Sequence, residues 1–448
     1  MNEILIGKTN DGIKIAVPNN LRCGHVQVIG ATGRGKTESV IIPWMMQDMF
    51  QGNCTVLIDG KGDKSIYTLL EAVNREEGLN ETLAYFDIAN ISSSMTTNPL
   101  KYGSSQQLVD RIFSSLEFDN SYFKVVSENA CHFVIKLIHA QNDVKNQEVK
   151  FKTLFDSLTD DSKLSELFLG VSENLSKNFE GDMSQFLNQK FSDRQEKVSG
   201  FLAQISPLAC GELAEIINGS VNGKAEFSLS EIFCPKVRKN NLSNKVHSKM
   251  TCNVPKVAVL LLPTLLYQQS ASILGKIFLQ EIAWSIASRE ALGDKEFSSL
   301  FLDEFGSFVY PGFLGLLNKA RSAKLAVHIS HQSLGDLSEV SDSFAQAIHT
   351  NTNIKCILGV NDPITADFFA KHLGTLDIIE ATERAEKDLF GDYDKSGSLN
   401  IRQSEAYKIH PNNLKNYSQG KGIISFINNG DAIAEEIQFL RSPFRLKG

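Results

Sequence analysis

The sequence lacks any hydrophobic run long enough to cross a membrane. A transmembrane helix needs about 20 consecutive apolar residues, whereas the longest apolar run here covers residues 257–262. The N-terminus, MNEILIGKTNDG, has the pattern of neither a signal peptide nor a transit peptide. We therefore expect a chain that is soluble by itself and works in the cytoplasm.

Paired cysteines and an excess of positive charge are also missing. The seven cysteines form no C-x-x-C pair, which favours reduced, buried thiols over a disulfide framework or a zinc site. The net charge of −7 argues against a uniformly basic coat for nucleic acid, but it is compatible with a local basic lining because electric fields are local. The length of 448 residues leaves room for two or three domains.

What the sequence does contain is a phosphate-binding loop. Residues 25–37, HVQVIGATGRGKT, read as an apolar strand that runs into G-x-x-x-x-G-K-T, and a helix-compatible segment follows. The glycines let backbone N–H groups point at phosphate oxygens, and the helix N-terminus favours the same anion. Lys36 is expected to reach the β- and γ-phosphates, and the Thr37 hydroxyl to bind Mg²⁺. The expected nucleotide-binding residues are Gly30, Ala31, Thr32, Gly33, Arg34, Gly35, Lys36, Thr37 and Glu38.

An acidic motif at the end of a later strand indicates that the bound nucleotide is also hydrolysed. The apolar residues 300–302 run into Asp303 and Glu304. In a P-loop ATPase, Asp303 would hold the Mg²⁺ shell and Glu304 would polarise the attacking water. The motif alone is weak, because an acid after an apolar run is a common strand end. Together with the phosphate loop, it indicates an enzyme that hydrolyses ATP with Mg²⁺.

Two polar residues flank the next expected strand, residues 325–330. Gln332 follows that strand, so it shares a sheet edge with Lys36 and Asp303. Its amide can sense the γ-phosphate or position water. Arg321 precedes the strand and could complete the site of a neighbouring subunit as an arginine finger. On the residues alone, a plain surface arginine is nearly as good an interpretation.

The order of elements predicts an α/β fold with a helical insertion. Apolar strands alternate with helices in residues 1–103 and again in 251–448, which predicts a mostly parallel sheet covered by helices on both faces. Residues 104–232 show helical periodicity and no convincing strand, so we expect an inserted all-α domain over residues 104–250. Local signals predict a turn at residues 10–12, a helix break at Pro43, a helix starting at Pro363 and a hairpin turn at Asn429-Gly430.

Two polar stretches have both a plain and a functional interpretation. Residues 235–249 carry five Lys/Arg and no acid; they are a solvated linker or a DNA-facing loop, since phosphate contacts need clustered cations. Residues 380–403 are expected to form a mobile loop. Within it, residues 392–403 follow the spacing of an EF-hand, but Gln403 stands where the bidentate carboxylate is needed, which argues against calcium binding.

Several blocks together resemble the TraD/TraG-type coupling proteins of conjugative type IV secretion. They occur in order along about two-thirds of the chain: HVQVIGATGRGKTESVIIP, VLIDGKGDKS, NPL, VAVLLLPTLL, LFLDEFGSF, LLNKARSAKLAVHISHQSLGDL and IHPNNLKNYSQGKGIISF. Residues 303–337 carry the most specific part of the resemblance. The helical insertion matches by position and type only, and looks like the all-α domain that these proteins carry between the halves of their ATPase domain.

The resemblance implies a RecA-like ATPase that forms a hexameric ring. Such a ring hydrolyses ATP to drive DNA, with its attached relaxase, towards a secretion channel. By motif position, the resemblance assigns Lys36 and Thr37 to nucleotide and Mg²⁺, Asp303 and Glu304 to the Walker B roles, Arg321 to a finger in trans and Gln332 to a sensor.

This chain departs from the family pattern at its N-terminus and in the phosphate loop. Family members usually begin with transmembrane helices, whereas this chain starts almost directly at the ATPase domain. We therefore expect a separate membrane protein to recruit it to the inner face of the membrane, or a role away from the usual channel. Arg34 occupies a loop position where the residue is commonly small, although a cation there is compatible with phosphate binding.

The load that such a motor would move is expected to be single-stranded DNA. A double-stranded DNA pump resembling FtsK or HerA has the same order of motifs and is the nearest alternative. A third hypothesis is a recruitment platform, in which the helical insertion docks protein cargo and nucleotide controls assembly. The Asp303-Glu304 pair argues against a purely structural role, since an inert scaffold does not need an acid that polarises water.

Overall fold

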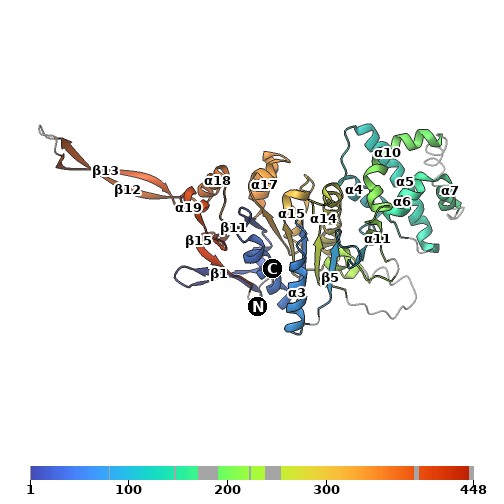
Figure 1. The fold of residues 1–448 in the computed structure, drawn as a ribbon, viewed down its shortest axis with the longest axis horizontal. Helices are drawn as coiled ribbons and strands as arrows, with labels where there is room; N and C mark the ends of the chain where they lie inside the picture. The colour runs from blue at the N-terminus through green and yellow to red at the C-terminus, as the bar shows by residue number, and fades with distance from the viewer. Residues whose placement is uncertain are drawn as a thin grey trace.

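A large mixed sheet forms the centre of the molecule (Figure 1). The computed structural model describes residues 2–79, 81–145, 148–169, 190–220, 223–237, 254–387 and 393–442. The order of the eleven strands is β2-β1-β15-β14-β11-β3-β10-β9-β4-β8-β5. Their bounds are β1 (Glu3–Thr9), β2 (Lys14–Pro18), β3 (Val26–Ile29), β4 (Cys54–Asp59), β5 (Leu83–Asp87), β8 (Val257–Leu261), β9 (Ser298–Asp303), β10 (Leu325–His331), β11 (Ile354–Leu358), β14 (Lys421–Asn428) and β15 (Asp431–Phe439).

The strands from β11 to β5 run parallel, so all of them end at one edge of the sheet. The register shows this directly, because Asp59 at the end of β4 pairs with Asp303 at the end of β9. Ile29, at the end of β3, likewise pairs with His331 at the end of β10. We call this side of the sheet the carboxyl edge and the opposite side the amino edge.

Helices cover both faces of the sheet, as the sequence predicted. The alternation of side chains along β4 explains the two layers, because Val56 and Ile58 join one hydrophobic core and Leu57 joins the other. The helices of the sheet domain are α1 (Asn19–Arg22), the π-helical turn η1 (Thr37–Ile41), α2 (Ile42–Phe50), α3 (Lys64–Glu76), α14 (Gln268–Ala291), the 3₁₀ turn η3 (Phe305–Phe308), α15 (Phe313–Ala320), α16 (Gly335–Ser338), α17 (Asp342–Asn351), α18 (Pro363–Leu373) and α19 (Pro411–Asn416).

The small local predictions are confirmed. Pro43 lies in the first turn of α2, directly after the π-helical turn η1, because a proline has no N–H to continue the preceding helical ladder. Asp362 caps α18 by accepting hydrogen bonds from the backbone N–H groups of Ile364 and Thr365. The hairpin of β14 and β15 turns at Asn429 and Gly430, which both have a positive φ as a type I′ turn requires.

A group of helices at one end of the molecule follows β5 in the chain (Figure 1). Their core is continuous with one face of the sheet: Phe113 and Phe201 stack at 4.9 Å and belong to the same hydrophobic cluster as Phe86 and Phe278. The helices are α4 (Ser105–Phe113), α5 (Ser121–Lys145), α6 (Phe151–Thr159), α7 (Asp161–Leu169), α10 (Phe191–Ala209), α11 (Ala214–Ile217) and α12 (Leu229–Phe233).

The expectation that this part contains no strand was wrong. A short strand β7 (Glu226–Phe227) pairs in parallel with β6 (Thr96–Thr97). Two residues are too few to show the alternating pattern on which a strand prediction depends. The pairing fastens the helical part to the segment after β5.

The expectation of a mobile loop at residues 380–403 was also wrong, because two long strands form there. β12 (Thr375–Lys387) and β13 (Tyr393–Tyr407) pair antiparallel in a hairpin that extends away from the rest of the molecule (Figure 1). The two strands satisfy each other's backbone groups, so they need no apolar face to mark them in the sequence. Residues 393–403 are extended strand, which excludes an EF-hand loop wrapped around an ion. Residue 392 lies outside the described residues, as do residues 238–249 of the basic stretch.

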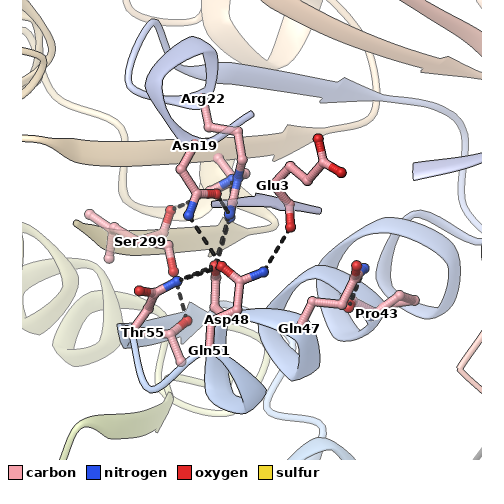
Figure 2. A network of polar contacts seen from close by, with 12 residues as sticks. Glu3, Asn19, Arg22, Pro43, Gln47, Asp48, Gln51, Thr55 and Ser299 are labelled. Atoms are coloured by element: carbon pink, nitrogen blue, oxygen red, sulfur yellow. Dashed lines mark hydrogen bonds and ion pairs between the residues drawn. The ribbon is translucent and has the colours of Figure 1, made fainter. Parts of the chain in front are cut away.

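A buried ion pair joins α1 to α2 (Figure 2). Arg22 and Asp48 have no exposed side-chain surface and approach to 2.6 Å. Asn19 Oδ1 accepts a further hydrogen bond from Arg22 at 2.9 Å. His328 of β10 also contacts Arg22, and burial together with this guanidinium holds the pKa of His328 well below its usual range. The neutral ring can therefore accept from Arg22 while Nδ1–H donates to the Leu300 carbonyl.

Within the described residues, no helix combines the length and the apolar character that a membrane span requires.

Candidate functional site

The phosphate loop lies where β3 ends, at the carboxyl edge. Gly33 and Gly35 have φ angles of 78° and 89°, values that side chains with a Cβ rarely adopt, so the glycines are needed for the path of the loop. Lys36 is buried, and its Nζ donates to the carbonyl of Gly30 at 2.7 Å. The side chain of Lys36 therefore bonds back to the first residue of its own loop, and Thr37 begins the following helix.

Thr37 and Asp303 meet at this edge. The Thr37 hydroxyl donates to Oδ2 of Asp303 at 2.6 Å. The other carboxylate oxygen, Oδ1, accepts from the hydroxyl of Ser330 at 2.6 Å and from the backbone N–H of Glu304 at 3.1 Å. Asp303 is thus held by three donors, and its carboxylate cannot turn freely. A hydroxyl and a carboxylate side by side are the hard oxygen ligands that Mg²⁺ prefers.

Glu304 and Gln332 form a second polar pair above the same edge. Gln332 Nε2 donates to Oε2 of Glu304 at 3.1 Å, and its Oε1 accepts from the Thr32 hydroxyl at 3.0 Å. Glu304 has a φ of 51°, a left-handed conformation that is unfavourable for a glutamate. This local strain turns the side chain away from the direction that a continued strand would give it. Strained residues of this kind concentrate at functional sites.

Asp59 is a residue of this site that sequence reasoning missed. It lies at the end of β4 beside Asp303 and lines the same pocket as Lys36 and Thr37. Its carboxylate accepts from the backbone N–H groups of Lys61 and Asp63 at 2.9 and 2.8 Å. Burial and, secondarily, the neighbouring Asp303 raise the pKa of Asp59 to about 6. The available signal was an acid after a buried strand, but only the strand order shows that β4 is next to β9.

Arg34 and Glu38, two residues expected to bind nucleotide, contact the C-terminal part of the chain. Arg34 donates to the carbonyl of Tyr417 at 2.9 Å and to Oδ1 of Asn361 at 3.3 Å. Glu38 accepts from Gln419 at 3.1 Å, and both Glu38 and Gln419 line the pocket. The two side chains thus connect the phosphate loop to the segment between α19 and β14.

Arg321 is the one predicted site residue that the structure does not bring to the carboxyl edge. It follows α15 and precedes β10, so it lies at the amino edge. A seven-residue strand rises about 3.3 Å per residue, and β10 separates Arg321 from Gln332 by that whole length. Arg321 therefore cannot reach the phosphate loop of its own chain.

A directional chain of hydrogen bonds starts at the loop that carries Gln332 and runs through the sheet. The first link places His331 Nδ1 2.7 Å from the carbonyl of Ser333, so Nδ1 must be the donor. His331 Nε2 then accepts from Gln27 Nε2 at 2.9 Å. Gln27 Oε1 accepts from His349 Nδ1 at 3.3 Å, and His349 Nε2 accepts from His372 Nδ1 at 3.2 Å. In this assignment each nitrogen or oxygen atom of the chain acts either as a donor or as an acceptor, which requires that the imidazole rings are neutral.

Burial keeps these histidine rings neutral. It lowers the pKa of His331 to about 4 and, with help from the nearby Lys355 charge, that of His349 to about 3. The chain of hydrogen bonds therefore holds the backbone of Ser333, next to Gln332, by contacts that persist at neutral pH.

Comparison with known proteins agrees with the geometry. Residues 298–416 match a family model described as the TraM recognition site of TraD and TraG. The type 4 coupling protein DotL of Legionella pneumophila is 24% identical, over 90% of this chain and 56% of DotL. The chain thus spans little more than half the length of this relative.

Solved structures of conjugative coupling proteins share the fold. The unbound form of the bacterial conjugative coupling protein TrwBdeltaN70 has a TM-score of 0.64 at 13% identity and covers 99% of this chain and 90% of that one. The plasmid coupling protein TrwB in complex with ADP and Mg²⁺ has a TM-score of 0.62 at 15% identity, with 99% and 90% covered. These findings confirm the predicted fold of a RecA-like P-loop ATPase and the resemblance to TraD/TraG-type coupling proteins.

Proposed function

We propose that this chain is an ATP-hydrolysing motor of the type IV coupling class that moves DNA. The observation that carries the proposal is the contact between Thr37 and Asp303, with Glu304 and Gln332 beside it. The phosphate loop alone would support nucleotide binding. The adjacent Asp303-Glu304 pair, held in place by Ser330 and Gln332, supports hydrolysis.

In this proposal, the residues of the carboxyl edge divide the work on ATP. Lys36 leaves the Gly30 carbonyl and binds the β- and γ-phosphates, while the backbone N–H groups of the loop surround the phosphate oxygens. Glu304 polarises the attacking water and accepts its proton. Gln332, already bonded to Glu304, senses the γ-phosphate and orients that water.

Thr37 and Asp303 would hold Mg²⁺, because their two oxygens are adjacent and belong to the preferred ligand class. When bound, the ion would neutralise charge on the phosphate oxygens. Ser330 would then keep Asp303 oriented through its second carboxylate oxygen. Asp59 is a second buried carboxylate beside this pair, and we propose that it tunes the charge of the site.

Arg321 would act on the nucleotide of another copy, as an arginine finger in trans. Its position at the amino edge supports this role, since its own phosphate loop lies beyond the length of β10. A site completed by a neighbour requires a ring or a filament of head-to-tail copies. We propose a hexameric ring.

The proposed load is single-stranded DNA, and the proposed partners are a relaxase and a type IV secretion channel or a separate membrane anchor. The similarity to DotL and TrwB supports the coupling class, and the match of residues 298–416 to a TraM recognition site supports contacts with proteins of the DNA-processing complex. The helical part, residues 104–250, is proposed as an inserted domain, and its function is not assigned.

Electron microscopy with single-stranded DNA and a non-hydrolysable ATP analogue tests the proposal. We expect a closed ring with DNA in its pore, and the same sample with Lys36→Ala should not assemble around nucleotide. Rings that enclose only double-stranded DNA would favour a pump resembling FtsK or HerA. Particles that bind a relaxase through the helical part and no DNA would favour a recruitment platform.

A further inference from the structure

Two adjacent leucines shortly after β8 are largely exposed. Leu265 is 99% exposed and Leu266 is 71% exposed. Single exposed leucines are ordinary on protein surfaces, but a contiguous apolar patch marks a binding surface more often. We call residues 263–267 the leucine loop.

The leucine loop is held in place by hydrogen bonds. The backbone N–H and the hydroxyl of Thr264 both donate to the carbonyl of Gly60, at 3.0 and 3.1 Å. The N–H groups of Leu266 and Tyr267 donate back to the carbonyl of Pro263, each at 3.1 Å. The backbone of the loop is thus satisfied locally, and the leucines are presented to solvent by a defined turn.

The leucine loop lies beside the nucleotide site. Its anchor, Gly60, follows Asp59, and the segment after Gly60 contributes Lys61 and Asp63 to the lining of the phosphate-loop pocket. The leucines therefore flank the surface that a second copy must approach if Arg321 acts in trans.

The amino edge offers a complementary surface beside Arg321. A cavity of about 1030 Å³ lies there and includes Leu317 and the 57% exposed Ile427 among its apolar groups. We call it the Arg321 cavity. Its described lining holds the exposed cations Arg321 and Lys408, together with the buried Lys355, and no Asp or Glu.

The charges of the two edges are opposite. The described lining of the phosphate-loop pocket contains the carboxylates of Glu38, Asp59, Asp63, Asp303 and Glu304, against two lysines. Complementary charges on two surfaces favour their association and fix its direction.

We propose that the leucine loop of one copy packs into the Arg321 cavity of the next copy, which brings that copy's Arg321 to the nucleotide. This inference rests on the proposed function, because it takes Arg321 as a finger in trans. The contact is head-to-tail: it uses two different surfaces of the chain, so it generates a ring or a filament.

Sedimentation velocity of the full chain with ATP analogue and Mg²⁺ measures the contact without any ATPase assay. The variant Leu265→Ser/Leu266→Ser removes the apolar patch at exposed positions, and Leu169→Ser at the 83% exposed Leu169 of α7 is the matched control. We expect the double variant to need at least tenfold more protein for assembly and the control to behave as wild type. Unchanged assembly of the double variant, or a wild-type chain that never assembles, would overturn the proposal.

Mixing two variants tests the direction of the contact. Arg321→Ala keeps the leucine loop, and Leu265→Ser/Leu266→Ser keeps Arg321, so one interface in a mixed assembly has both partners intact. We expect ATP hydrolysis to recover on mixing, to several times the sum of the separate rates. No recovery from variants that co-assemble would contradict the head-to-tail contact. Loss of DNA binding with normal assembly in the double variant would identify the leucine loop as a nucleic-acid contact and overturn the proposal.

These outcomes are distinct from failure of the proposed function. A wild-type chain without ATPase activity would refute the motor, while the sedimentation result would still report on the contact between copies.

Discussion

The hydroxyl of Thr37 lies 2.6 Å from Oδ2 of Asp303, although 266 positions separate the two residues in the chain. The parallel register brings them together, since β3, β10 and β9 are neighbours and end at the same edge. This contact joins the phosphate loop to the acidic motif, and it is the structural basis for the predicted Mg²⁺ site.

The first prediction concerns this pair. Asp303→Asn and Thr37→Ala are each expected to lower the ATPase rate by about 100-fold or more, because stabilisation of charge by a metal ion contributes several kcal/mol. The activity of Thr37→Ala should recover partly at high Mg²⁺. Steady-state hydrolysis across a Mg²⁺ titration measures both effects, and Thr68→Ala, at an exposed threonine of α3, is the control. If Asp303→Asn had wild-type activity, Asp303 would not be a functional residue of the site.

The second prediction concerns Arg321 at the amino edge. Arg321→Ala is expected to lower the ATPase rate of the assembled protein by about 10³-fold, the scale of known arginine fingers. Nucleotide binding by dilute, unassembled chains should not change, because Arg321 cannot reach its own site. Nucleotide titration and hydrolysis assays separate the two effects, and the exposed Lys319→Ala is the control for lost charge. Weaker nucleotide binding by the dilute variant would place Arg321 in its own site instead.

Much of the carboxyl edge could be predicted from the sequence, because each of its residues follows a strand that the apolar pattern marks. The prediction that Lys36, Asp303 and Gln332 lie at one edge needed only the assumption of a parallel sheet. Asp59 could not be predicted in the same way, since its role depends on β4 lying next to β9, and lateral strand order leaves no periodic signal. For Arg321 the sequence predicted only a position before a strand, and the structure shows that this position lies at the amino edge, away from the phosphate loop of its own chain.

The β12–β13 hairpin is an element that the pattern of apolar residues does not predict. Its strands are rich in charged residues and pair only with each other, so they resemble a polar loop in sequence. The buried ion pair of Arg22 and Asp48 was missed for a related reason. Charged residues are usually exposed, and only the three-dimensional packing shows that these two are not.

The third prediction tests that ion pair. Asp48→Asn keeps the shape of the side chain but leaves the guanidinium of Arg22 buried without its counter-charge. Breaking a buried pair in this way costs roughly 3–5 kcal/mol, so the urea midpoint should fall clearly. Asp156→Asn is the control, because Asp156 pairs with partly exposed lysines and such pairs contribute about 0–1 kcal/mol. Equal effects of the two variants would show that the Arg22–Asp48 pair adds no special stability.

The fourth prediction concerns the pH dependence of stability at Lys355. Burial lowers the pKa of this lysine from its ordinary value of 10.5 to about 7. Between pH 7 and 10.5 the unfolded chain therefore binds a proton that the folded chain releases, so this group makes the folded state more stable as the pH rises. Below pH 7 both states are protonated and the cost of burying the charge is fully present. The slope is at most about 1.4 kcal/mol per pH unit.

Urea unfolding of wild type and Lys355→Met at pH 7 and 9.5 checks this sign. The difference in unfolding free energy, wild type minus variant, should increase with pH, because methionine has no charge to bury. Lys319→Met reports the effect of removing an exposed lysine. A wild-type advantage that shrinks towards pH 9.5 would mean that Lys355 is buried as a stabilised cation.

The ATP hydrolysis rate with and without single-stranded DNA tests the central claim most directly. We expect wild type to hydrolyse ATP faster when single-stranded DNA is added, and to respond less to the duplex of the same sequence. Glu304→Gln should bind ATP normally and hydrolyse it about 10²- to 10⁴-fold more slowly, the usual contribution of a positioned base. Lys36→Ala should be inactive, and Lys8→Ala at an exposed position should equal wild type. A folded wild-type chain that neither hydrolyses ATP nor binds DNA would contradict the account.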